Sequence, residues 1–225
     1  GAYGGIAPNP AQAIAELVSS LHNPDGSIAV DGFCDGIERP TGEEVAAAEA
    51  GAGTKEAYEA DIGCEAVGGE KGKSIVERNS FEPTIEVNGI HSGYAGPGSK
   101  TVIPSEAFAK ISMRLVPGQS IRAVRDAVTA HLKSRCPRGM TLSIEDYAPG
   151  AGGFRLPLAS PLFRLASDVL SEMDDRGAVY QWDGASIPVI LMAAACAVFM
   201  AVRHKENFKR LIQGKESKFS LKGKK

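Results

Sequence analysis

The chain has 225 residues, with 25 Lys and Arg against 27 Asp and Glu, and 43% of its residues are hydrophobic. This composition is typical of a globular protein with one domain or two small ones, and it excludes a disordered, collagenous or disulfide-rich chain. The net charge of −2 and the lack of a basic stripe with interleaved aromatic residues argue against a nucleic-acid partner.

A helix is predicted over residues 10–22. Asn9 is a favourable N-cap, Pro10 is favoured at the first helical position, and apolar residues follow at helical spacing. A turn comes next, and residues 28–30 are predicted to form a short strand. Between residues 41 and 79 the abundance of Ala, Glu, Gly and Lys indicates short surface helices joined by flexible loops.

From Pro83 the hydrophobic period changes to two. Residues 84–90 and 105–116 alternate between apolar and polar side chains, as half-buried strands do, and a loop rich in Gly, Pro and Ser separates them. These two segments are therefore predicted to be consecutive strands.

Ser120 is predicted to cap a helix that ends at Cys136 and Pro137, and residues 140–147 alternate again as a third strand. The order is then helix, strand, strand, helix, strand. One strand before the first helix would complete a βαββαβ ferredoxin-like unit. We therefore predict an α+β fold with a ferredoxin-like domain that lacks its first strand.

The last third of the chain follows a Gly-rich linker. A helix is predicted over residues 161–173, a strand over 178–180 and a tight loop over 183–188. Residues 189–202 are fourteen consecutive apolar residues, fewer than the roughly 20 that span a bilayer, so we favour a buried helix over a membrane span. The tail at 203–225 carries +7 and the remainder −9, which indicates a segment of different origin or role.

The potential metal ligands are scattered along the chain. Histidines and cysteines occur singly, without HExxH or CxxC spacing, so neither a local zinc site nor a redox motif is predicted. We expect structural roles for the histidines and a reducing compartment for the protein. These residues are His22, His91, His131 and His204, and Cys34, Cys64, Cys136 and Cys196.

Arg114 is the most informative polar residue. It is predicted to lie mid-strand, on the face opposite Ile111 and Met113. A strand arginine is usually a solvated cross-strand partner. The functional alternative is a bidentate clamp for a substrate carboxylate, which the planar guanidinium suits.

Four sequence blocks stand in an order that is found in a known family. They are residues 1–10 (GAYGGIAPNP), 21–35 (LHNPDGSIAVDGFCD), 98–117 (GSKTVIPSEAFAKISMRLVP) and 183–188 (DGASIP). These blocks resemble the two-zinc aminoacylase, carboxypeptidase and dipeptidase family, and most of all its cytosolic nonspecific dipeptidases and carnosinases. The resemblance implies a zinc catalytic domain interrupted by a ferredoxin-like lid domain that mediates homodimerisation.

The resemblance also implies roles for three residues. Arg114 would bind the terminal carboxylate of the substrate, and Gly184 and Ser186 would contact the substrate through the backbone and a hydroxyl. No catalytic residue and no metal ligand carries over to this chain, because the zinc ligands and the general-base Glu of the family have no matching position. His91 and Ser92 repeat a His-Ser pair that the family places elsewhere, so we assign them no role.

We therefore predict a lid and dimerisation domain over residues 1–147, with a variable helical insertion at 41–80. Residues 148–190 would be part of a catalytic subdomain, and residues 191–225, an apolar segment and basic tail, match no part of the family. The sequence starts at Gly1 without an initiator Met, and we expect this to reflect processing or truncation.

The predicted function is that of a dimerisation-domain fragment of a zinc-dependent dipeptidase or aminoacylase-like hydrolase, inactive alone. We expect no cofactor in this chain, two zinc ions and a dipeptide-like substrate in the intact family member, a homodimer formed through the lid, and a cytoplasmic location. Two alternatives stay open: a non-catalytic homodimerising interaction module, and a tail-anchored membrane protein.

Overall fold

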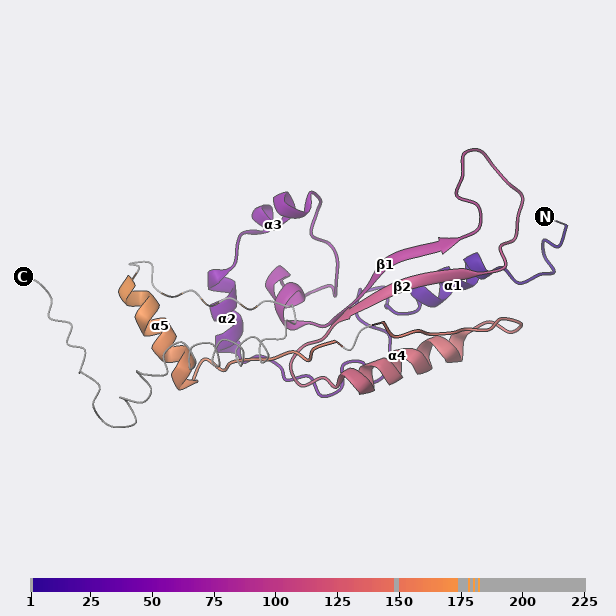
Figure 1. The fold of residues 1–225 in the computed structure, drawn as a ribbon. Helices are drawn as coiled ribbons and strands as arrows, with labels where there is room; N and C mark the ends of the chain where they lie inside the picture. Colours follow the sequence, from indigo (N-terminus) through magenta and orange to yellow (C-terminus); the bar gives the residue numbers. More distant parts are fainter. Residues whose placement is uncertain (1, 148–149, 174–177, 179, 181, 183–225) are drawn as a thin grey trace, which may run out of the picture. The chain divides into compact units, whose positions relative to one another are not determined.

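The computed structural model describes residues 2–147, 150–173, 178, 180 and 182. It combines helices with one antiparallel hairpin, so the predicted α+β class is confirmed (Figure 1). In chain order the elements are α1 (Pro10–Ser19), α2 (Gly42–Gly51), α3 (Lys55–Ile62), the π-helix η1 (Glu77–Phe81), β1 (Thr84–Ser92), β2 (Ala107–Arg114), α4 (Ile121–Arg135) and α5 (Pro161–Met173).

Helix α1 begins as predicted but ends earlier than residue 22. The Asn9 side chain accepts a hydrogen bond from the Ala11 N–H at 3.0 Å. The helix stops at Ser19 because the following residues pair with a later segment: the Leu21 carbonyl accepts from the Ala29 N–H at 2.8 Å. The strand predicted at 28–30 is correspondingly wrong, since this pairing amounts to an isolated bridge between His22 and Ile28.

The segment between residues 41 and 79 contains helices, as predicted. Helix α2 starts with a capping box, in which Thr41 and Glu44 exchange hydrogen bonds between side chain and backbone. Helix α3 ends at Ile62 and is capped by Gly63, which takes a left-handed conformation with φ +72°. The π-helix η1 that closes this segment is not predicted by the sequence pattern.

Strands β1 and β2 pair antiparallel, from Thr84 opposite Arg114 to Ser92 opposite Ala107. Both strands lie where the period-two alternation predicts them. A bulge between Val87 and Gly89 shifts the register, so the two ends of the hairpin are not related by simple alternation.

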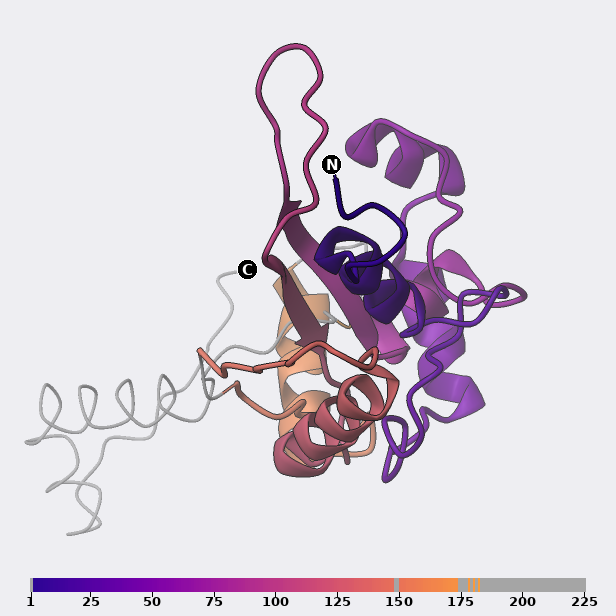
Figure 2. The same ribbon diagram turned by 90° about the vertical axis from the view of Figure 1, so that its right-hand side faces the viewer.

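Helices α1 and α4 pack with the hairpin around one hydrophobic core (Figure 2). Helix α4 is capped by Ser120 and ends before Cys136 and Pro137, as predicted. Helix α5 also matches its predicted bounds. The buried core residues are Leu17 from α1, Leu21, Val30 and Phe33 from the segment that follows it, Ile85 from β1, and Val124, Val128 and Leu132 from α4.

The third strand predicted at residues 140–147 is not formed. Within the described residues the sheet has only the strands β1 and β2. A strand needs a neighbour with which to form backbone hydrogen bonds, and in the expected order that neighbour is a strand before the first helix. No described residue forms such a strand, so the ferredoxin-like arrangement stays a prediction. The segments predicted at 183–188 and 189–202, and residue 179 of the strand at 178–180, lie outside the described residues.

Candidate functional site

Arg114 is the last residue of β2, whereas the sequence pattern predicts a mid-strand position. Its side chain is half-buried, and its Nη2 donates a hydrogen bond to the Arg78 carbonyl oxygen at 3.1 Å. Its Nε is buried and has no hydrogen-bond partner among the described residues. A buried donor without a partner is costly in a folded protein, and an acceptor that reached this N–H would remove that cost.

The electrostatic setting of Arg114 favours an anion. Burial lowers the pKa of its guanidinium, and the nearby Glu86 carboxylate opposes this effect. The group still carries its charge at neutral pH, because the ordinary pKa of arginine lies far above neutrality. Within the described part of the chain Arg114 forms no direct ion pair, so a carboxylate in contact with it would supply the missing hydrogen-bond acceptor.

Arg78, which supplies the acceptor for Arg114, is a site residue that the sequence reasoning missed. It lies 36 positions upstream and contacts Arg114 through its backbone carbonyl, which no residue type reveals. One sequence signal points to it: residue 83, five positions after Arg78, is a proline and has no N–H to offer that carbonyl.

A cavity of about 460 Å³ lies beside this region, between residues 22–28, 67–71 and 82–86. Its charged residues are mainly acidic, and two of them are paired with a lysine nearby. Lys73 forms ion pairs with Glu70 at 2.8 Å and with Glu82 at 2.7 Å. This cavity is therefore less suited to an anion than the buried edge of Arg114.

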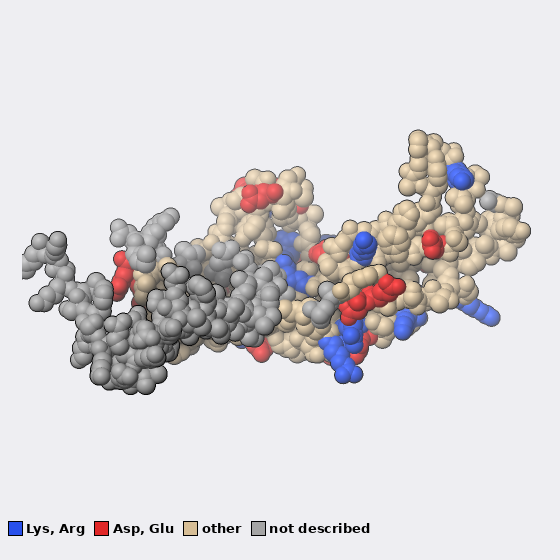
Figure 3. Space-filling view, in the orientation of Figure 1, with Lys and Arg blue, Asp and Glu red and all other residues tan. Residues whose placement is uncertain are grey.

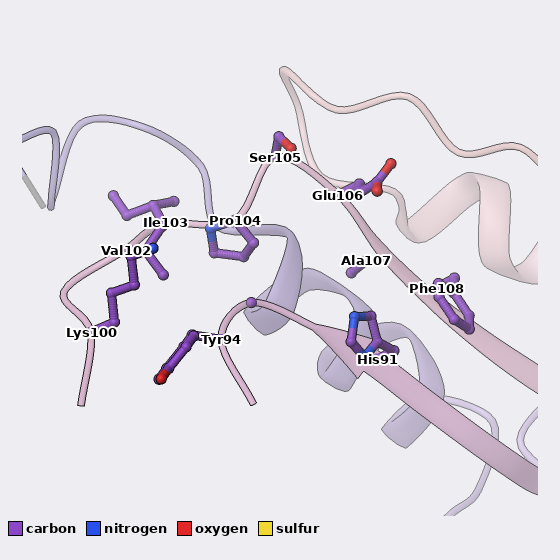
Figure 4. Close-up of a pocket in the computed structure, with 11 residues that line it drawn as sticks. His91, Tyr94, Lys100, Val102, Ile103, Pro104, Ser105, Glu106, Ala107 and Phe108 are labelled. Atoms are coloured by element: carbon purple, nitrogen blue, oxygen red, sulfur yellow. The ribbon is translucent and has the colours of Figure 1, made fainter. Parts of the chain in front are cut away.

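A second cavity, of about 420 Å³, lies in the loop that joins β1 to β2 (Figure 4). At its base the His91 and Phe108 rings lie 5.5 Å apart between centroids. The Lys100 Nζ lies 5.8 Å from the centroid of the Tyr94 ring. The Ser92 hydroxyl donates to the Glu106 carbonyl at 2.9 Å, a structural contact. Nothing in this loop assigns a catalytic role to the pair of residues 91 and 92.

His131 has the structural role predicted for it. It is 7% exposed, and its Nε2 lies 3.0 Å from the Ser20 carbonyl oxygen, which joins α4 to the end of α1. Among the described residues no three His, Cys, Asp or Glu side chains converge into a group that could hold a metal ion. The described residues therefore do not fit the zinc ions that the resemblance implies for the intact family member, and we derive no step through zinc.

The remaining predicted site residues and surfaces can be placed only in part. Gly184 and Ser186 lie outside the described residues. Among the described residues on the face shown in Figure 3, Lys and Arg side chains are interspersed with Asp and Glu and form no continuous basic stripe. Of the helices that the structure describes, none combines the length and the apolar character needed to cross a membrane.

Solved structures share this α+β arrangement. An M20 family metallo-carboxypeptidase from Sulfolobus solfataricus superposes with a TM-score of 0.69 at 26% identity, over 83% of this chain and 48% of that one. Human carnosine dipeptidase 1 gives a TM-score of 0.68 at 26% identity, over 84% of this chain and 41% of the other. The fold is therefore that of part of an M20 metallopeptidase.

A comparison of the sequence with protein families identifies the family. The model of the peptidase dimerisation domain of M20 peptidases matches residues 1–140, more than half of the chain, and the chain belongs to this family. Human Beta-Ala-His dipeptidase is 32% identical over 133 residues, which are 59% of this chain and 26% of that protein. Cys-Gly metallodipeptidase dug1 of Schizosaccharomyces pombe is 27% identical over 59% of this chain and 28% of its own length. The chain thus spans about a quarter of the length of these curated relatives.

Proposed function

We propose that this chain provides the dimerisation lid and part of the substrate-binding surface of a dipeptidase-like metallohydrolase. The membership of residues 1–140 in the dimerisation-domain family supports the first part. The names of the relatives, both dipeptidases, support the second. The observation that carries the proposal is the buried, unpartnered Nε of Arg114, because a dipeptide has a carboxylate that this group can bind.

Arg114 would act by fixing one end of the substrate. Its guanidinium is already held by the Arg78 carbonyl, and the free Nε–H is a charge-assisted donor for a carboxylate oxygen. Such a contact orients the substrate and favours a free carboxyl terminus over an amide. In the same proposal Gly184 and Ser186 contact the substrate through the backbone and a hydroxyl, and two zinc ions act in the intact family member. We further propose a cytoplasmic homodimer.

A matched pair of ligands tests the role of Arg114. Glycylglycine has a free carboxylate, and glycylglycinamide replaces it with an amide. The full chain would be titrated with each, and the Nε–H resonance of Arg114 would be followed by NMR. We expect the acid to bind at least about tenfold more tightly than the amide, because a hydrogen bond to a charged group contributes about 1.5–3 kcal/mol.

Two variants complete this test. Arg114→Lys is expected to remove the preference for the acid, since an ammonium cannot reproduce the planar donor geometry. Arg122→Lys is the matched control, because the Arg122 side chain is 86% exposed on α4, and it should leave the preference unchanged. If glycylglycine and its amide bind equally, or if Arg114→Lys keeps the preference, Arg114 is not a carboxylate-binding residue.

The dimerisation proposal is tested separately by sedimentation equilibrium. We expect the full chain to sediment at twice the mass of one chain, with a dissociation constant that can be measured by dilution. A monomer at every concentration reached would refute homodimerisation and would leave the carboxylate site to be judged by its own titration.

A further inference from the structure

The Arg78 carbonyl is freed from helical hydrogen bonding by the sequence that follows it. In η1 the Glu82 N–H bonds to the Glu77 carbonyl at 3.1 Å, a step of five residues. The same step from Arg78 leads to Pro83, which has no N–H. The carbonyl is thus left for a donor from elsewhere, and Nη2 of Arg114 fills that place at 3.1 Å.

The side chain of Arg78 connects η1 to the loop that precedes it. Its guanidinium donates to three backbone carbonyls upstream: Ala66 at 3.1 Å, Ser74 at 3.4 Å, and Gly68. Gly69 has φ +78°, and a Cβ there would lie only 3.1 Å from the Arg78 Cδ. Three hydrogen bonds to three different backbone carbonyls restrict the position of the Arg78 guanidinium more than a single contact would.

Two further contacts fix the turn itself. Ser74 and Glu77 exchange hydrogen bonds, with the Ser74 N–H donating to the Glu77 carboxylate at 2.7 Å and the Glu77 N–H donating to the Ser74 hydroxyl at 3.1 Å. At the other end Phe81 is buried, and its ring meets that of Trp182 edge-on at 4.6 Å between centroids. The carbonyl that holds Arg114 therefore belongs to a segment that is anchored at both ends.

We infer that Arg78 is a positioning residue for Arg114. Its guanidinium anchors the π-turn, and its own carbonyl, left free by Pro83, fixes the plane of the Arg114 guanidinium so that the buried Nε–H points in one direction. A long side chain that is ordered before binding loses less conformational freedom when the ligand arrives. The inference rests on the proposed function, since it explains how Arg114 is ordered before the proposed carboxylate binds.

The experiment uses the full chain and the ligand pair glycylglycine and glycylglycinamide. In Arg78→Ala we expect the affinity for glycylglycine to fall about tenfold, the amount that reordering one long side chain can cost, while the affinity for the amide stays unchanged. The heteronuclear NOE of the Arg114 Nε–H in the unliganded chain should fall at the same time, because the side chain becomes mobile. Arg78→Lys keeps one donor and should restore part of both quantities.

The outcomes separate the inference from the proposed function. If Arg114→Lys loses the preference for the acid but Arg78→Ala keeps both the affinity and the NOE, then Arg78 has no positioning role and the carboxylate site stands. If Arg114→Lys keeps the preference, the proposed function fails and the inference fails with it. Arg122→Ala, on the exposed face of α4, is the control and should change neither quantity. If Arg78→Ala does not fold, Arg78→Lys decides, and wild-type affinity and NOE in that variant overturn the inference.

Discussion

Gln119 joins two segments that are far apart in the sequence, and its replacement tests how the chain after Arg114 is held. The side chain is 7% exposed. Its Oε1 accepts from the Val116 N–H at 2.8 Å, and its Nε2 donates to the Phe33 carbonyl at 2.6 Å. Gln119 thus ties the turn that follows β2 to the hydrophobic core.

Replacing Gln119 with Leu keeps the approximate size but removes both hydrogen bonds. Each buried polar group left without a partner costs about 1–3 kcal/mol, so we expect the free energy of unfolding to fall by about 2–6 kcal/mol. That is a large part of the roughly 5–15 kcal/mol of a typical domain. Urea denaturation followed by circular dichroism measures the loss. The control is Gln12→Leu on the exposed side of α1, which should change stability by no more than about 0.5 kcal/mol.

Gln119→Glu sharpens the test through its pH dependence. A carboxylate at this position can accept from the Val116 N–H, but only the protonated acid can donate to the Phe33 carbonyl. Burial raises the folded-state pKa of the new group above its ordinary value of about 4.3. The stability that this group contributes to the Gln119→Glu variant is therefore fully present below a pH of about 4.3. It is lost as the pH rises through the folded-state pKa. The reasoning is refuted if Gln119→Leu is as stable as the wild type, or if Gln119→Glu shows the same pH dependence as the wild type.

Two other positions give predictions of opposite origin, one electrostatic and one steric. Burial lowers the pKa of His131, so the folded chain favours the neutral ring. Chemical denaturation should therefore show the free energy of unfolding falling as the pH drops below about 6.5. The same dependence of stability on pH in His131→Gln would contradict this. Gly118 has φ +90°, and a Cβ there would meet the Gly36 carbonyl oxygen, so Gly118→Ala should cost at least about 1–2 kcal/mol. Gly42→Ala, in open space on α2, should cost nothing, and equal thermal midpoints for the two variants would show the steric argument to be wrong.

The sequence predicted the helices best, because their ends depend on local chemistry. Ser120 and the Cys136–Pro137 pair set the bounds of α4, and Pro161 starts α5. The end of α1 was predicted too late. What stops α1 is the pairing of residues 21–22 with 28–29, which depends on chain that comes after the helix and so leaves no mark on its hydrophobic period.

Strands were predicted correctly only where their partner is near in the sequence. The alternation at 84–90 and 105–116 became β1 and β2 because the two segments are consecutive along the chain and one connecting loop, residues 93–106, brings them together. The alternation at 140–147 is equally regular, yet no strand forms there among the described residues. Alternation reports a side-chain pattern that would suit a sheet. It does not report whether a neighbouring backbone is present to complete the hydrogen bonds.

The candidate site also combines one residue that the local sequence indicates with a contact to a distant residue that it does not indicate. Arg114 could be named as a candidate from its residue type, its strand and the resemblance of its block, and its role stays a proposal. The acceptor that holds it could not, because a backbone carbonyl is the same for every residue type, and this one lies 36 positions away. What the sequence does contain is the reason that the carbonyl is free, the missing N–H at Pro83. We therefore expect a substitution at position 78 to keep the acceptor and still release Arg114, since the guanidinium of Arg78 bonds to the carbonyls of Ala66, Gly68 and Ser74.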